Sequence, residues 1–113
     1  MANHFKFTGT ALSDTNLTTL IIPIGSSIFI VNSILVVNTD TNTDSIIDLI
    51  ITDTSQGVSY NILKAEPYKA GWSREVLARP LILENLDVLK AQANDANVFN
   101  VLISYLDRDR EKK

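Results

Sequence analysis

The sequence predicts a single all-β domain: an antiparallel β-sandwich, jelly-roll-like or immunoglobulin-like, with little or no helix. Three observations support this prediction. Turn-forming clusters of Gly, Pro, Ser, Asn and Asp recur along the chain, and short runs rich in β-branched and aromatic residues separate them. Several of these runs alternate apolar and polar residues with period two. A length of 113 residues, with 45% hydrophobic and 20% charged residues, fits one globular domain with one core.

The expected strands follow from these runs. Residues 5–8 alternate aromatic and polar side chains, and residues 47–53 place Ile47, Leu49 and Ile51 on one apolar face. Residues 28–37 are apolar on both faces except for Asn32 and Ser33, which predicts a central strand or one covered by a neighbouring subunit. In residues 99–105 the alternation predicts an inward and an outward set. The inward set is Phe99, Val101, Ile103 and Tyr105, and the outward set includes Asn100 and Ser104.

One stretch could be mistaken for a membrane span, and another offers the only helical alternative. Residues 17–37 are strongly apolar, but Pro23 and Gly25 interrupt them and their β-branched residues favour strands, so we expect no membrane-spanning helix. Residues 74–89 leave room for a short helical turn, but Pro80 would break a longer helix and the leucines also fit an extended pair around Glu84-Asn85. We expect one domain over residues 1–113, ending in a charged, flexible tail at 107–113.

Composition argues against several function classes. The net charge of −3 and the lack of a basic stripe disfavour nucleic-acid binding, which needs clustered Lys and Arg. The absence of cysteine excludes a disulfide framework, a thiolate metal site and a thiol nucleophile. The first residues lack a charged segment followed by an apolar run, so we expect no secretory signal.

The segment from Asp40 to Asp44 reads D-x-N-x-D, a pattern of oxygen ligands that calcium loops use. The candidate ligands are Asp40, Asn42 and Asp44. A helix-loop-helix calcium site would also need Gly at its sixth position and Glu at its twelfth, where this chain has Ser45 and Ile51. The favoured interpretation is a solvated turn whose side chains bond their own backbone.

Catalytic patterns are scarce. His4 is the only histidine and lies next to the terminus, no Gly-x-Ser-x-Gly turn is present, and no glycine-rich phosphate loop occurs. We therefore predict no catalytic, cofactor-binding or metal-ligating residue, and a protein that is not an enzyme.

The aromatic loop around Trp72 is the clearest candidate for an interface. Tyr68, Trp72 and Arg74 lie close together in the sequence and could anchor a partner, although Trp72 could equally cap the core at the edge of the sandwich. Val31 and Leu35, in the stretch that is apolar on both faces, complete the candidate interface set. A second hypothesis is a carbohydrate- or receptor-binding module in which Tyr60, Tyr68 and Trp72 stack on sugars.

The C-terminal part resembles a group of small β-sandwich structural proteins of tailed bacteriophages. Those proteins carry a hairpin with a Leu-Glu-x-Gly-Asp-x-Ile type turn, then a basic strand, then an Asn-rich segment and a closing strand resembling x-Val-x-Ile-Ser-Tyr-Leu-Glu. Residues 81–93 and 101–107 are similar to these segments, and Asn38-Thr39 followed by residues 47–53 is similar to their opening hairpin. Leu86 stands at the usual glycine position, which suggests a turn built around Asn85, and Trp72-Ser73 replace small polar residues.

This resemblance covers about residues 28–107 and rests on strand-and-turn patterns. It implies a virion component of head (including capsid decoration), neck, tail or baseplate, made in the cytoplasm of a bacterial host. It also implies a protein that assembles as a homo-oligomer and with other virion proteins, without a cofactor. The resemblance carries over no functional residue.

Overall fold

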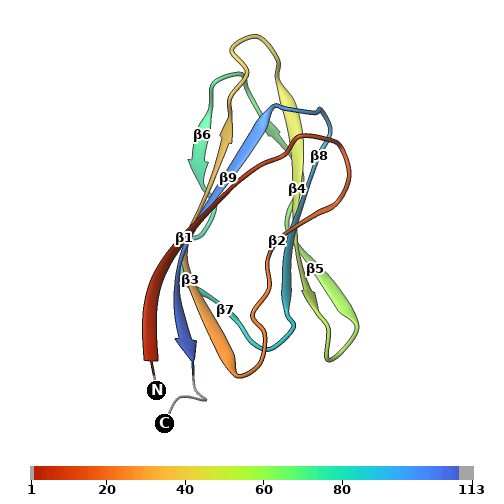
Figure 1. The fold of residues 1–113 in the computed structure, drawn as a ribbon. Coiled ribbons are helices and arrows are strands. Elements are labelled where there is room, and N and C mark those ends of the chain that lie inside the picture. The colour runs from red at the N-terminus through yellow and green to blue at the C-terminus, as the bar shows by residue number, and fades with distance from the viewer. Residues whose placement is uncertain (1, 110–113) are drawn as a thin grey trace.

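The computed structural model describes residues 2–109, and these form nine antiparallel strands (Figure 1). The strands are β1 (Ala2–Ala11), β2 (Thr18–Ile21), β3 (Ser27–Asn38), β4 (Ser45–Asp53), β5 (Val58–Tyr68), β6 (Ser73–Glu75), β7 (Leu81–Leu83), β8 (Val88–Ala93) and β9 (Phe99–Asp109). Within residues 2–109 there is no helix long and apolar enough to cross a membrane.

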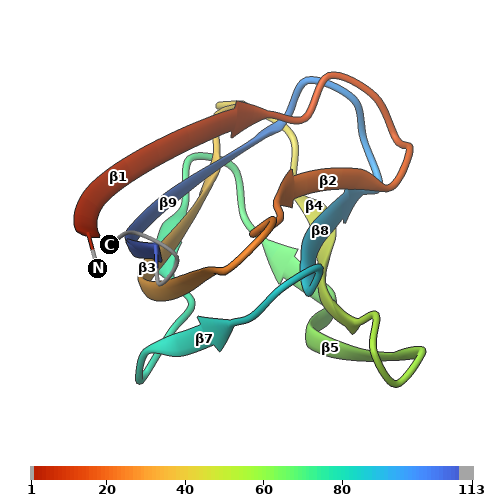
Figure 2. The ribbon, with the colours of Figure 1, turned by 60° about the horizontal axis from the view of Figure 1, so that its bottom comes forward.

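Two sheets face each other, as the sequence predicted (Figures 1 and 2). Sheet A has the order β1-β9-β3-β6, with β7 also paired to β3, and sheet B has the order β2-β8-β4-β5. Counted inward from the two ends, the first half of the chain pairs with the second half: β1 with β9, β2 with β8, β3 with β6 and β7, and β4 with β5. This is the pairing of a jelly roll, in which β6 and β7 share one strand position.

The core lies between the sheets and follows the predicted alternation. Phe99, Val101, Ile103 and Tyr105 of β9 are buried, and Ser104 is exposed. Ile47 and Leu49 of β4 are buried, and Ile51 packs partly buried against them. The predicted inward sets of both strands are therefore confirmed.

Strand β3 is the central strand that its composition predicted, but a bulge changes its phase. It lies between β9 on one side and β6 with β7 on the other, and its pairing with β9 shifts between Val31 and Ser33. Before the bulge the buried residues are Phe29 and Val31; after it they are Ile34 and Val36. The extra residue, Asn32, explains why no simple alternation is visible in residues 28–37.

Three sequence-based expectations are wrong in detail. Neither β3 with β4 nor β7 with β8 forms a hairpin, because in each case the two strands belong to different sheets and the chain crosses between them. The expected tail begins too early, since β9 continues to Asp109 and Asp107 is buried; residues 110–113 lie outside the described residues. By contrast, the prediction of extended structure in place of a helical turn is confirmed for residues 73–75 and 81–83, which form β6 and β7.

The turn before β8 is built around Leu86, not Asn85. Leu86 has φ +65°, the left-handed conformation that glycine adopts without strain, and its N–H donates to the Pro23 carbonyl at 2.9 Å. Leu86 therefore adopts, in this chain, a backbone conformation that favours glycine.

Replacing Leu86 by glycine should leave the protein more stable than Leu86→Ala by about 1 kcal/mol, because alanine keeps the strain of the left-handed conformation, about 1–2 kcal/mol, and glycine removes it at some cost in unfolded-chain entropy. The Leu86 side chain is 44% exposed, so both variants lose the same partial burial and the comparison between them isolates the strain. Urea unfolding measures the difference. If Leu86→Gly is no more stable than Leu86→Ala, strain at this turn is not significant.

Candidate interaction surface

A row of apolar side chains crosses the outer face of sheet A. Strand register places Phe5 beside Leu106, Leu106 beside Ile30, and Ile30 beside Ile82, so the row spans β1, β9, β3 and β7. Leu106 and Ile30 are half-buried by their neighbours, whereas Phe5 is 85% and Ile82 60% exposed. We call Phe5, Leu106, Ile30 and Ile82 the apolar row. Within the described chain no element covers it.

The apolar row ends at β1, the outermost strand of sheet A (Figure 2). The alternation in residues 5–8 is opposite to that of a strand whose aromatic face packs on the core: Phe5 and Phe7 point outward and Phe7 is 64% exposed. Lys6 points to the other face, where its ammonium group lies 3.2 Å from an Asp107 carboxylate oxygen. Exposed aromatic side chains on an open edge mark a surface for pairing with another chain.

The predicted interface residues separate into two groups. Val31 is 0% and Tyr68 2% exposed, and the Tyr68 ring packs edge-to-face against Phe99 with 5.6 Å between centroids. These two side chains are buried in the core of this chain and have almost no surface to offer a partner. Leu35 lies on the outer face of sheet A, beside Leu102 of β9 and Glu75 of β6.

Trp72 lies half-buried against the core, where the chain passes from β5 to β6. The Arg74 guanidinium covers its ring at 4.0 Å from the centroid, and the Lys69 ammonium lies 5.8 Å away. This placement agrees with the interpretation of Trp72 as a cap on the core. Because Tyr68 is buried, it cannot join Tyr60 and Trp72 in an aromatic platform for sugars. Burial raises the pKa of the Tyr68 phenol, and the nearby Arg74 charge partly opposes this.

Glu75 links β6 to the bulge of β3, and nothing in the sequence pattern pointed to it. One carboxylate oxygen accepts a hydrogen bond from the Ser33 hydroxyl, and the other accepts from the Ile34 N–H at 2.8 Å and the Leu77 N–H at 3.2 Å. Desolvation works to raise the pKa of Glu75, but the hydrogen bonds donated by Ser33 and the two backbone groups outweigh it and hold the pKa below its ordinary value.

Replacing Glu75 by glutamine should lower the free energy of unfolding at neutral pH by about 1 kcal/mol, because an amide oxygen accepts these hydrogen bonds less strongly than a carboxylate. The folded-state pKa lies below the unfolded one, so the Glu75 contribution is fully present above the unfolded pKa and is lost as pH falls through the folded pKa. The wild type and Glu75→Gln should therefore converge in acid. Urea unfolding at a series of pH values checks this; a difference that does not change with pH would contradict it.

The Asp40–Asp44 segment forms a turn that uses its own side chains. The Asp40 carboxylate accepts from the Asn42 N–H at 2.8 Å, and this hydrogen bond lowers the pKa of Asp40. The Asp44 carboxylate instead accepts from the Ala70 N–H at 2.9 Å. These contacts agree with the favoured interpretation of a backbone-bonded turn. In the part of the chain from 2 to 109, no three His, Cys, Asp or Glu side chains are grouped so that they could hold a metal ion.

Asn38, at the end of β3, anchors this turn to the core. The side chain is 1% exposed; its amide donates to the Thr43 carbonyl at 2.9 Å and the Tyr68 carbonyl at 3.1 Å, and its oxygen accepts from the Asp40 N–H at 3.0 Å. No pattern in the sequence predicts this role.

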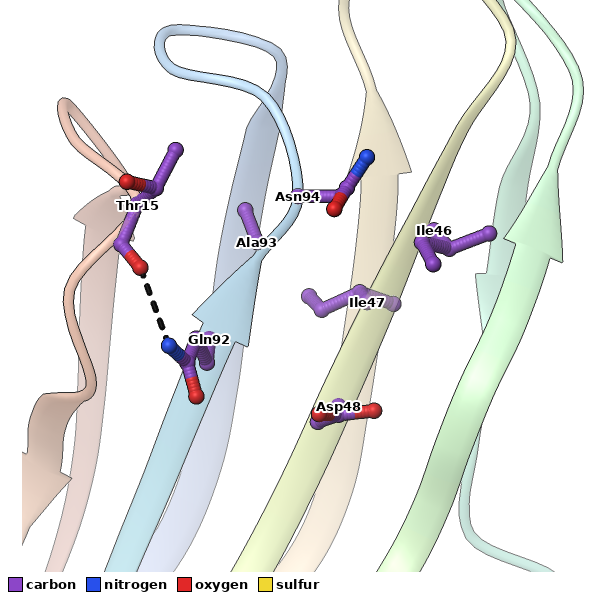
Figure 3. A pocket seen from close by; sticks show the side chains of 7 residues that line it. All are labelled: Thr15, Ile46, Ile47, Asp48, Gln92, Ala93 and Asn94. Carbon is purple, nitrogen blue, oxygen red and sulfur yellow. Dashed lines mark hydrogen bonds between the residues drawn. The ribbon is translucent and has the colours of Figure 1, made fainter.

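A hollow of about 420 Å³ lies over the other sheet, between the segment before β2 and strands β8 and β4 (Figure 3). Seven residues line it: Thr15, Ile46, Ile47, Asp48, Gln92, Ala93 and Asn94. The Gln92 amide donates to the Thr15 carbonyl at 3.0 Å. Asp48 is the single carboxylate in this lining, and it already accepts the Ala65 N–H at 2.6 Å. His4 is exposed on β1 and does not line the hollow. The lining offers no pair of carboxylates and no aromatic ring.

Comparison with known proteins adds a likeness of fold. No family model matches the chain, and no curated protein matches it. Among solved structures, the chain is similar to one in the cryo-EM structure of a virus-like particle of the extra small virus of the giant freshwater prawn, Macrobrachium rosenbergii. The TM-score is 0.42 and the identity 13%, over 94% of this chain and 80% of that chain.

Proposed function

We propose that this protein is a non-enzymatic structural subunit of a virus particle that works by packing against other copies of itself and against other virion proteins. The observation that carries the proposal is the apolar row on the outer face of sheet A, which runs to the open edge strand β1. A monomer that remained alone would leave Phe5, Phe7 and Ile82 in water. The jelly roll is a fold that capsid subunits share with lectins and cupins, so the surface, more than the fold, supports the proposal.

The more specific proposal is a component of a tailed bacteriophage, made in the bacterial cytoplasm and placed in the head, neck, tail or baseplate. The resemblance of residues 81–93 and 101–107 to phage structural proteins supports it. The left-handed backbone of Leu86 is consistent with that resemblance, because Leu86 stands where those proteins carry glycine and glycine favours this conformation.

Sedimentation velocity over a wide range of protein concentration tests the self-association. The wild type should form a defined oligomer as the concentration rises, and Phe5→Ser/Phe7→Ser should remain monomeric with an unchanged far-ultraviolet circular dichroism spectrum. Tyr60→Ser is the matched control, because Tyr60 is a 55% exposed aromatic residue on β5 of the other sheet. Mass spectrometry of purified particles then tests the virion role. A chain that stays monomeric and is absent from particles would contradict the proposal.

A further inference from the structure

The free edge of β1 is long enough to pair with another strand and has no partner among the described strands. Ala2–Ala11 pairs with β9 along its whole length on one side, and no strand follows it on the other side in the order of sheet A. Its N–H and C=O groups on that side can extend the sheet if a second extended strand lies beside them.

Geometry restricts how two β1 strands of identical chains can pair. When two identical strands pair antiparallel about a two-fold axis, directly opposed residues have their side chains on the same face of the sheet. Their backbone groups are also either both hydrogen-bonded across the pair or both not. One residue therefore lies on the axis, opposite the same residue of the second copy. An axis at Lys6 would pair residues 2–10, and an axis at Phe7 would pair residues 3–11. Axes at Phe5 or Thr8 would leave more of the strand unpaired. The choice is therefore between Lys6 and Phe7.

Charge decides between these two axes. An axis at Lys6 places two ammonium groups directly opposite each other, and like charges in that position destabilise a strand pair. An axis at Phe7 places Lys6 opposite Thr8, a neutral polar residue, and leaves the ion pair of Lys6 with Asp107 in place. The two Phe7 rings then face each other on the outer surface.

The same register places Phe5 of one copy opposite Gly9 of the other. A Cβ atom at Gly9 would lie 3.2 Å from Leu102 Cδ2 and 3.8 Å from the Phe7 ring, so these two side chains of the same chain already lie against Gly9 on the outer face. Glycine within a strand weakens it and marks a close approach by another group, and an aromatic residue across the pair covers such a glycine. In this register Phe5 of the second copy would pack across Gly9 against Leu102 and the Phe7 ring that border it.

The contact is of the size that a weak, specific dimer needs. A buried aromatic side chain contributes about 150–250 Å². The four phenylalanine rings and the two paired strand edges together bury on the order of 1,000 Å², the lower limit for a biological interface. The apolar row of one copy then continues through its Phe5 into Leu102 and Leu35 of the other.

We infer that β1 pairs antiparallel with β1 of a second copy across a two-fold axis at Phe7, which joins the two A sheets into one. This rests on the proposed function, because it names the partner and the register of the surface proposed there. The strand that pairs with the free edge of β1 therefore belongs to a second copy of this chain.

Single cysteine substitutions test the register, since the chain has no cysteine of its own. Residues directly opposed across the pair have Cα atoms about 4.5–5.5 Å apart, within the range of a disulfide. Phe7→Cys should therefore form a covalent dimer on oxidation. Phe5→Cys is the matched control: it lies on the same face, but its two copies are offset by about 14 Å along the strands and should stay uncrosslinked. Lys6→Cys and Thr8→Cys complete the scan.

Each outcome of the scan has a distinct meaning. Preferential cross-linking at residue 5, 6 or 8 would move the axis and overturn the inference. Association of the wild type without cross-linking at any of the four positions would show that another surface is used; the proposed function would stand and the inference would fail. No association of the wild type at any concentration would remove the inference, and absence of the chain from purified particles as well would remove the proposed function.

A charge change at residue 8 tests the same register with both phenylalanines kept. Thr8→Glu places a carboxylate opposite Lys6 of the second copy and should lower the dimer dissociation constant about two- to tenfold, whereas Thr8→Lys should raise it by a similar factor. Salt should reduce both effects. Equal shifts for the two variants would show that residue 8 does not face Lys6, which overturns the axis at Phe7.

Discussion

Val31→Asp is expected to unfold the protein at room temperature. Val31 is 0% exposed, on the inner face of the central strand β3, where its direct neighbours across the strand pairs are Tyr105 and Leu81. Burying an unpaired carboxyl group costs several kcal/mol, and a domain of this size is stable by only about 5–15 kcal/mol. Circular dichroism at room temperature and a thermal melt would measure the loss, and a cooperative melt close to that of the wild type would contradict the burial of Val31.

Ile30→Asp is the control that separates the two faces of the same strand. Ile30 precedes Val31 in the chain but lies half-buried on the outer face, in the apolar row between Leu106 and Ile82. A carboxylate there can reach water, so the variant should fold with a modest loss of stability. Unfolding by both substitutions would mean that the outer face of sheet A is also covered in the monomer.

Asn38→Ala is expected to lower the free energy of unfolding by about 2–4 kcal/mol. The buried amide satisfies the carbonyls of Thr43 and Tyr68 and the N–H of Asp40, and alanine leaves these backbone groups without the partner they have now. Urea unfolding monitored by Trp72 fluorescence would measure the change.

Asn42→Ala provides the comparison for that measurement. Asn42 lies in the same turn but its side chain is exposed, so the substitution should change stability by no more than about 0.5 kcal/mol. Similar losses for the two variants would mean that the Asn38 side chain does not hold the turn to the core.

The sequence predicts the sandwich and part of its core because alternation with period two is a direct record of which side chains are buried. That record is clear in β9, where Phe99 to Tyr105 alternate without interruption, and in β4. It fails in β3, because the bulge at Asn32 moves the buried set from odd to even positions. It is ambiguous in β1, because alternation does not say which face is inward.

The pairing of strands is beyond such patterns. Adjacent strands joined by short turns suggest hairpins, yet the turns after β3 and β7 carry the chain from sheet A to sheet B. Sequence patterns also do not predict the two polar residues that link distant segments. Asn38 and Glu75 act through contacts with residues distant in the sequence, such as Tyr68 and Ser33. The residues next to them in the sequence do not predict these contacts. The sequence allows two interpretations of Trp72, an interface anchor and a cap on the core, and its contact with the core agrees with the cap.

The most direct test of the outer face of sheet A as the working surface is hydrogen exchange of the backbone amides of β1 as a function of protein concentration. If β1 pairs with a second copy, the amides along its free edge should exchange more slowly as the concentration rises, and Phe5→Ser/Phe7→Ser should abolish that protection. Amides of β1 that exchange at one rate at every concentration, while those of another edge such as β5 become protected, would contradict the account.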